Sequence, residues 1–162
     1  MKEKIIIYTD GSCDKNPGGN GGFSSIIFID ENPLFLTGYE PNTTNQRMEM
    51  RAVIQSLAYL DSIIDKREEV IICTDSAYVC NCILQGWYKT WYKNGWVNSK
   101  GEKVANQDLW EQLLNYVLQY PNIKFIKVKG HSDNIFNNKC DEMAKDVVSF
   151  KKIIDNNINL KR

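Results

Sequence analysis

Ile5-Ile6-Ile7-Tyr8-Thr9-Asp10-Gly11-Ser12 is the stretch that decides the fold, and Val70-Ile71-Ile72-Cys73-Thr74-Asp75-Ser76 repeats its pattern. Each is an apolar, largely β-branched run that ends in Thr-Asp and a small residue. A run of this length with polar or turn residues at its end predicts a strand buried on both faces. Each aspartate then follows a central strand, at the sheet edge where open α/β folds place their ligands. The pattern therefore predicts an α/β fold with two carboxylates at one edge, which suggests a divalent-metal site.

The composition is that of an ordinary globular domain. The chain has 162 residues, of which 43% are hydrophobic and 25% charged, and its 20 basic and 20 acidic residues cancel. A domain of this size buries roughly 70% of its unfolded surface. Because net charge gives no sign of a nucleic-acid partner, any basic surface must come from local clustering.

Other classes are excluded by simple counts. No apolar stretch approaches the ~20 residues that span a bilayer, and the first residues lack a signal pattern. The five cysteines lack the spacing of a zinc site or a disulfide framework, so we expect reduced thiols. We expect a cytoplasmic protein with no membrane partner, and a monomer because no long apolar heptad pattern occurs.

Apolar periodicity and turn residues predict the order β-β-β-α-β-α-α-β-α. That order describes a mixed five-stranded sheet with helices packed on its faces. Residues 1–150 form the predicted domain, and the polar tail 151–162 is expected to be loosely ordered. The predicted strands are about 4–9, 23–29, 34–40, 70–74 and 123–128. The predicted helices are about 76–84, 106–118 and 138–148, besides one after Asn45 with Met50, Val53, Ile54, Leu57 and Leu60 on its apolar face.

Glu49 and Asp141 lie near the starts of two predicted helices, where the helix dipole favours an acid. Taken alone, each is better explained as a solvated surface residue that the dipole favours. Asp10 and Asp75 are stronger candidates, because a carboxylate next to a buried strand needs a partner for its charge. If all four converge, their repulsion raises their pKa values unless cations occupy the site. Oxygen ligands favour Mg²⁺ or Mn²⁺, and two such ions roughly 4 Å apart can activate a water for phosphodiester cleavage.

Two other ligand motifs fail. Asp10-x-Ser12-x-Asp14 begins like a calcium loop, but Lys15 replaces the required glycine and Gly21 the final glutamate. The glycine-rich segment 16–22, predicted as a loop, lacks the Gly-Lys-Ser/Thr of a nucleotide-binding loop. Neither motif offers an alternative to the carboxylates.

Several separated motifs occur in a fixed order along residues 3–148. With them the chain resembles ribonuclease HI, the bacterial type of the RNase H family. The resemblance implies an RNase H-like fold, with three antiparallel N-terminal strands and two further strands. It also implies cleavage of the RNA strand of RNA–DNA hybrids, giving 3′-hydroxyl and 5′-phosphate ends. The motifs are Tyr8-Thr9-Asp10-Gly11-Ser12-Cys13, Asn16-Pro17-Gly18, Thr44-Asn45-Gln46-Arg47-Met48-Glu49, Thr74-Asp75-Ser76, Val128-Lys129-Gly130-His131, and then Asn137, Cys140 and Asp141.

The resemblance also assigns roles to residues. Two Mg²⁺ ions, with Mn²⁺ as a substitute, are expected on Asp10, Glu49, Asp75 and Asp141. His131, the only histidine, is expected to assist by moving a proton or helping product leave, since a histidine side chain ordinarily titrates near neutral pH. The expected substrate contacts are Cys13, Asn16, Asn45, Gln46, Trp87, Lys89, Lys93, Asn106, Trp110 and Asn137.

Residues 86–103 concentrate tryptophans, tyrosines and lysines. The aromatic residues are explained equally well by a small satellite core, whereas the lysines between them are free to meet phosphates. In the family this segment is a basic handle that grips the DNA strand, and here it is less basic. The polar side chains of Asn16, Asn45 and Gln46 can contact 2′-hydroxyls, although turns and helix caps also explain the two asparagines.

Three functions are therefore weighed. The leading hypothesis is a metal-dependent endoribonuclease that acts on RNA–DNA hybrids. A binding module without catalysis has no use for clustered, unpaired carboxylates. Another nuclease or a DNA-strand transferase of the same broad fold does not account for the handle and the Asn/Gln loops.

Overall fold

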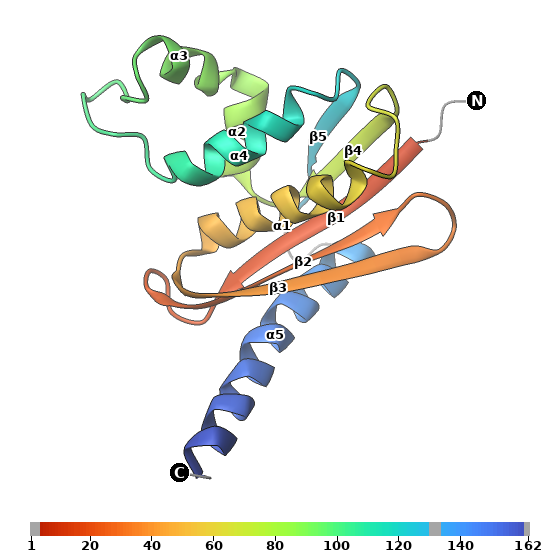
Figure 1. Ribbon diagram of the computed structural model, residues 1–162, viewed down its shortest axis with the longest axis vertical. Coiled ribbons are helices and arrows are strands. Elements are labelled where there is room, and N and C mark those ends of the chain that lie inside the picture. Colours follow the sequence, from red (N-terminus) through yellow and green to blue (C-terminus); the bar gives the residue numbers. More distant parts are fainter. Residues whose placement is uncertain (1–3, 130–133, 161–162) are drawn as a thin grey trace.

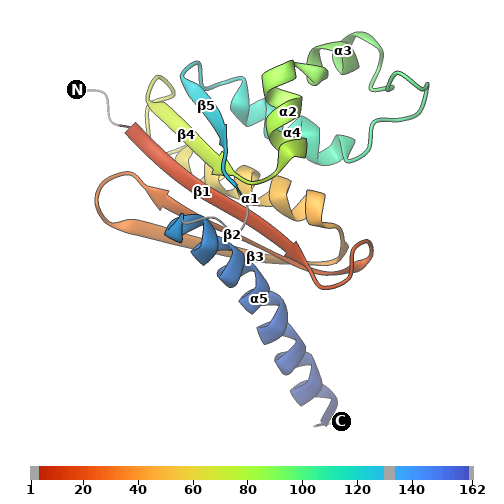
Figure 2. The same ribbon diagram turned by 180° about the vertical axis from the view of Figure 1, so that it is seen from behind.

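A five-stranded sheet lies between two layers of helices in the computed structural model, which describes residues 4–129 and 134–160 (Figures 1 and 2). The strands are β1 (Lys4–Cys13), β2 (Gly19–Phe28), β3 (Pro33–Thr43), β4 (Glu69–Thr74) and β5 (Ile123–Lys127). The helices are α1 (Asn45–Leu60), α2 (Ala77–Gln85), α3 (Trp87–Lys93), α4 (Gln107–Val117) and α5 (Ile135–Leu160). Helix α1 covers one face of the sheet with α2–α4 beside it, and α5 crosses the other face.

The strand order is β3-β2-β1-β4-β5, which confirms the predicted mixed sheet. Strands β1, β2 and β3 pair antiparallel, whereas β4 and β5 run parallel to β1. Strand β4 lies directly beside β1, and their pairing reaches from Lys4–Glu69 to Tyr8–Cys73. The two Thr-Asp endings are therefore neighbours at one edge of the sheet.

The burial of the two central strands differs from the prediction. Residues 70–74 of β4 are all buried, as expected for a strand covered on both faces. In β1, Ile5 and Ile7 are buried while Ile6 and Tyr8 are half-buried. The buried pair belongs to the main core, which also includes residues of α1 and α4. On the other face, Tyr8 meets Phe136 of α5, with 5.2 Å between ring centroids, and this single helix leaves part of the face open.

The first two strands are longer than predicted. Strand β1 continues past Thr9 to Cys13, and β2 begins at Gly19, so much of the segment predicted as a loop is strand. Gly22 shows why glycines occur inside β2: a Cβ there would lie 2.1 Å from the Ala144 carbonyl oxygen of α5. These glycines therefore serve close helix packing as well as turns.

Side-chain caps begin two of the helices. The Thr44 hydroxyl accepts a hydrogen bond from the Arg47 backbone N–H at 3.2 Å, and Ser76 caps α2 through the Val79 N–H at 3.1 Å. The expected apolar faces of α1 and α4 are buried. Helix α3 was not among the predicted helices, because its aromatic composition resembles a packed loop; Gly86, at φ 68°, separates it from α2.

The last helix is much longer than predicted. Helix α5 begins at Ile135. The Asn134 side chain caps it by accepting hydrogen bonds from the backbone N–H groups of Phe136 and Asn137, at 3.1 Å each. It continues to Leu160, so the expectation of a loosely ordered tail is wrong, and its C-terminal half extends beyond the sheet (Figure 1). Ion pairs hold its polar surface, including Lys152 to Asp14 at 3.0 Å. In the described part of the chain, no helix is long and apolar enough to cross a membrane.

Candidate active site

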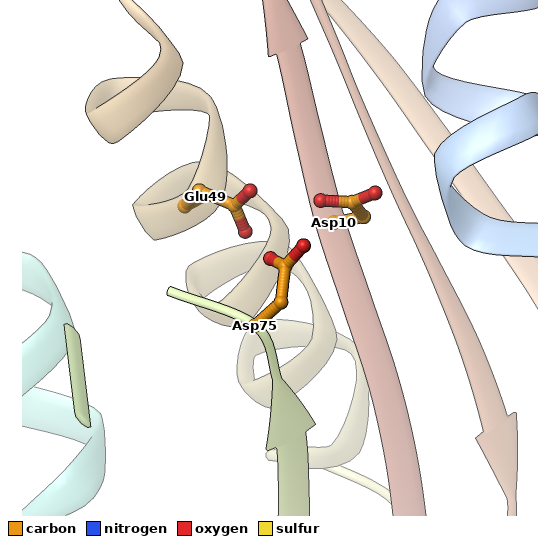
Figure 3. Close-up of side chains that lie close together, drawn as sticks. All are labelled: Asp10, Glu49 and Asp75. Atoms are coloured by element: carbon orange, nitrogen blue, oxygen red, sulfur yellow. The ribbon is translucent and has the colours of Figure 1, made fainter. Parts of the chain in front are cut away.

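Three carboxylates converge at the edge where β1 leaves β4. Asp10 comes from β1, Glu49 from α1 and Asp75 from the residue after β4, and their side chains point toward one another (Figure 3). One ligand oxygen from each lies within 4.8 Å of the other two. Such a spacing allows one cation to contact more than one of them.

The backbone explains why these acids meet. The parallel pairing of β1 and β4 ends at Tyr8 and Cys73, two residues before each aspartate. Strand β1 nevertheless continues through Asp10 beside β2, so Asp10 lies within a strand and not at its end as predicted. Gly11 lets α1 sit directly on β1, because a Cβ there would lie 2.5 Å from the Glu49 backbone nitrogen. This close approach sets Glu49 opposite Asp10.

Burial and mutual repulsion disfavour the charged forms of these carboxyl groups. Burial raises the pKa of Asp10 to about 7. A hydrogen bond with Glu49 lowers this pKa, and the charges of Asp75 and Asp141 raise it further. Burial, followed by the charge of Asp10, raises the pKa of Glu49 well above its usual value. Glu49 lies beyond the first turn of α1, so the predicted help from the helix dipole is outweighed.

The donor set fits a hard divalent cation. The buried Oε2 atom of Glu49 has no hydrogen-bond partner within the described structure. A buried polar atom without a partner is costly, and a carboxylate more so than a neutral group. Carboxylate oxygens are the ligands that Mg²⁺ and Mn²⁺ favour, and a bound cation lowers the pKa of its ligands. Asp10, Glu49 and Asp75 are therefore suited to hold such an ion.

Asp141 lies beside this triad without being part of its tight cluster. It is the seventh residue of α5 and not in the first turn as predicted, because the helix begins earlier. Its charge contributes to the raised pKa of Asp10, which shows that the two carboxylates are close. One of its oxygens, Oδ2, lies 3.0 Å from the Lys145 ammonium nitrogen.

Ser24 anchors the helix that carries Asp141. Its buried hydroxyl donates a hydrogen bond to the Cys140 carbonyl at 2.6 Å, and Ser24 is also the β2 partner of Asp10. The Cys140 thiol in turn donates to the Tyr8 carbonyl at 3.4 Å. These bonds fix Asp141 near Asp10. Nothing in the local pattern marks Ser24, because its role depends on the pairing register between strands far from α5 in the sequence.

The polar residues expected to contact substrate near β1 lie together. The Asn16 side chain accepts a hydrogen bond from the Asn45 backbone N–H at 3.1 Å, which joins the loop after β1 to the start of α1. The Cys13 thiol donates to the Lys15 carbonyl at 3.0 Å, and Asn16, Asn45 and Gln46 are exposed. Asn16, Asn45 and Gln46, which were predicted as substrate contacts from the resemblance, therefore lie close together. His131 lies outside the described residues.

The handle is an aromatic stack with lysines on its outside. We use this name for residues 86–103, which include α3. Trp91 packs against Trp87, Trp96 and the core residue Trp110, with ring centroids 5.6–6.4 Å apart. The aromatic residues therefore join the main core and do not form a separate one. Lys89 and Lys93 are exposed on α3.

Three of the expected substrate contacts are buried or half-buried. Trp110 has no exposed surface and donates a hydrogen bond to the Tyr78 hydroxyl at 2.9 Å, so the expectation of a direct contact is wrong. Asn137 is only 2% exposed, which likewise leaves almost no surface for a nucleic acid. Asn106 is half-buried and lies 3.4 Å from an Arg47 guanidinium nitrogen through its side-chain oxygen. Both buried side chains face the interior because their helices pack against the sheet or the core.

The fold and the site together define a class: α/β proteins that present a metal-binding carboxylate cluster at the edge of a mixed sheet. Within that class the chain belongs to the RNase H family, whose model matches residues 2–149. It is 47% identical over 148 residues to a ribonuclease H of Caldicellulosiruptor saccharolyticus, covering 91% of this chain and 97% of the relative. It is 44% identical over 148 residues to a ribonuclease H of Prosthecochloris aestuarii, with the same coverage.

Solved structures agree with this assignment. LC11-RNase H1 in complex with an RNA/DNA hybrid is 27% identical, with a TM-score of 0.65, and the match covers 91% of this chain and 98% of that chain. LC9-RNase H1 has a TM-score of 0.80 at 23% identity, covers 92% of this chain and 74% of that chain, and supports the fold alone.

Proposed function

We propose that this chain is an endonuclease that hydrolyses the RNA strand of RNA–DNA hybrids with the help of two divalent cations, leaving 3′-hydroxyl and 5′-phosphate ends. The observation that carries the proposal is the carboxylate triad, with ligand atoms within 4.8 Å, in a chain of the RNase H family. A module that only binds nucleic acid is disfavoured, because clustered acids repel the phosphate backbone, and because burial and then neighbouring charges raise the pKa values of Asp10 and Glu49.

Asp10, Glu49 and Asp75 hold the cations in this proposal, and Asp141 completes the set from α5. Mg²⁺ is the proposed ion and Mn²⁺ its substitute, because both prefer oxygen ligands. When bound, such ions supply an activated water and stabilise the leaving oxygen. The protein holds the carboxylates rigidly, since Asp10 is 3% exposed and its Oδ1 accepts the Gly11 N–H at 2.9 Å. His131 keeps its predicted auxiliary role in proton movement.

Substrate selection is assigned to two surfaces. Asn16, Asn45 and Gln46 are exposed side chains beside the triad that can exchange hydrogen bonds with 2′-hydroxyls, the groups that distinguish RNA from DNA. Lys89 and Lys93 on the handle are free to neutralise phosphates of the DNA strand. The relative solved with an RNA/DNA hybrid supports this choice of substrate. Action as a monomer in the cytoplasm stays a prediction.

The test is hydrolysis of a hybrid labelled on its RNA strand, with Mg²⁺ and with a chelator in its place. RNA–RNA and DNA–DNA duplexes of the same sequence serve as controls. We expect internal cuts in the RNA of the hybrid only, and only when the cation is present. Equal cleavage of the DNA duplex would overturn the substrate, and undiminished cleavage in the chelator would overturn the role of the cations.

A further inference from the structure

Asp141 differs from the other three carboxylates because it forms an ion pair with a lysine of the protein. The Lys145 ammonium nitrogen lies 3.0 Å from Asp141 Oδ2, one helical turn further along α5. Asp10, Glu49 and Asp75 have no ion pair to a lysine or arginine within the described residues. The triad and Asp141 are therefore prepared differently for a metal ion.

We propose that Lys145 competes with a divalent cation for Asp141, so that Asp141 joins the triad as a ligand only when the cation displaces the ammonium group. This inference rests on the proposed function, because it concerns the same metal site. The ammonium group lies on Oδ2, and a Mg²⁺ ion bound by Asp141 would lie about 2.0–2.1 Å from its ligand oxygen, so the two positive charges would repel each other across one carboxylate. Lys145 acts here as a positioning residue for Asp141.

The ion pair is weak enough to be exchanged. Both side chains are accessible, with 32% of Asp141 and 57% of Lys145 exposed, and pairs of this kind on a helix surface contribute little to stability. A divalent ion surrounded by several carboxylates is held by much larger electrostatic forces. The cation therefore wins the competition once its concentration is sufficient, and Lys145 raises the concentration required.

Space for the displaced ammonium group is present beside the helix. A cavity of about 350 Å³ lies between the end of β1 and α5, and Lys145 is one of its lining residues. Ser12, Ser149 and the Asp14–Lys152 ion pair also line it, so hydroxyl and carboxylate oxygens are present there to accept hydrogen bonds from the ammonium group. Lys145 can thus leave Asp141 by changing its rotamer, without any movement of the backbone.

The experiment measures Mn²⁺ binding by isothermal titration calorimetry without nucleic acid. Lys145→Met removes the competing charge and keeps the length of the side chain. If the protein binds two Mn²⁺ ions, we expect the affinity for the more weakly bound ion to rise about two- to fivefold in this variant. This range corresponds to the free energy of a weak surface ion pair. Lys145→Arg keeps the pair and is expected to bind Mn²⁺ as the wild type does. Circular dichroism checks that each variant is folded, and Lys145→Gln gives a second neutral variant.

Two controls separate competition at Asp141 from a general effect of charge. Lys151→Met removes the same charge from the same helix, where Lys151 is 39% exposed and lies 3.2 Å from Asp155 one turn further on, and we expect this variant to bind Mn²⁺ as the wild type does. In the Asp141→Asn background, Lys145→Met is expected to have no further effect, because the contested oxygen is already uncharged.

The outcomes distinguish this inference from the proposed function. Unchanged Mn²⁺ affinity in Lys145→Met, or an equal gain in Lys151→Met or in the Asp141→Asn background, overturns the competition while leaving cleavage by the wild type intact. A wild type that neither binds Mn²⁺ nor cleaves the hybrid overturns the proposed function and this inference together.

Discussion

The acidic triad and the handle are built on opposite physical plans. In the triad, charged groups are taken out of water and left without protein cations, so that Glu49 keeps a buried oxygen with no partner. In the handle, aromatic rings pack inward while Lys89 and Lys93 stay in solvent. The triad is suited to hold a divalent cation, whereas the handle packs against the core and offers charge to a partner.

The difference teaches how the two regions divide a function. Desolvated carboxylates have shifted pKa values and respond strongly to a bound cation, as expected of a reaction centre. Solvated lysines change little on their own and act additively through phosphates, as expected of a surface that provides affinity. Mutations in the first region should therefore change the rate of cleavage, and mutations in the second should change binding.

The largest effect is expected from Asp10→Asn. The amide keeps the shape of the side chain but removes the charge that holds the cation, so the cleavage rate should fall by about 10²–10³-fold or more. Single-turnover hydrolysis of a labelled hybrid measures the loss, and circular dichroism verifies the fold. Asp14→Asn is the matched control, since Asp14 lies nearby in an ion pair with Lys152. Near-normal cleavage by Asp10→Asn would show that the triad is not the reaction centre.

The second prediction concerns stability without metal. The pKa of Asp10 is about 7 in the folded protein, against 3.8 for an ordinary aspartate such as that of the unfolded chain. Folding therefore favours the protonated carboxyl group. This contribution is complete below about pH 4 and is lost as the pH rises toward 7, by on the order of 2–4 kcal/mol. Urea unfolding in a chelator at about pH 5 and about pH 8 should show the decline.

Asp10→Asn provides the control for this pH dependence. Because the amide does not titrate and also relieves Glu49 of a neighbouring charge, the variant should lose less stability over the same range. Added Mg²⁺ should restore the wild type at the higher pH more than the variant. Parallel declines in the two proteins would assign the pH dependence to other groups.

A smaller effect is expected in the handle. Lys89→Ala and Lys93→Ala should each weaken hybrid binding a few-fold and reduce the salt dependence of log K by about 0.7–0.9 per lost phosphate contact. Fluorescence anisotropy in the Asp10→Asn background measures binding without cleavage. Lys66→Ala, at an ion pair with Asp61 outside the handle, is the control. A large fall in cleavage rate with unchanged binding would reverse the division between the two regions.

The smallest effect is expected at the link between the regions. Arg47, two residues before Glu49 on α1, binds Asp108 on α4 through two hydrogen bonds of 3.0 and 2.8 Å. Its side chain is 23% exposed and that of Asp108 58%, so Arg47→Met should cost only about 1 kcal/mol of unfolding free energy. Urea unfolding measures it, and Asp108→Asn with the double variant tests whether the loss belongs to the pair. Additive losses would show that the pair contributes nothing.

The sequence determined the sheet and most of its helices, because apolar periodicity and capping residues act over a few neighbouring residues. The two Thr-Asp endings and the apolar face of α1 were identified in this way. The length of α5 was missed, since its last turns carry few apolar residues and are held partly by contacts such as Lys152 with Asp14. Helix α3 was missed although Trp87 and Trp91 have helical spacing, because its seven residues are too few for the period to be distinguished from a packed loop.

The site was determined only in part by the sequence. Residue types and motifs identified Asp10, Glu49, Asp75 and Asp141 as candidates, because few patterns place that many acids beside buried strands and helix starts. Only the tertiary structure decided that three of them are within 4.8 Å while Asp141 is paired with Lys145. Distance, burial and competition for a shared oxygen depend on the register of β1 with β2 and on how closely α1 and α5 approach the sheet. These are long-range contacts, and a local sequence pattern does not encode them.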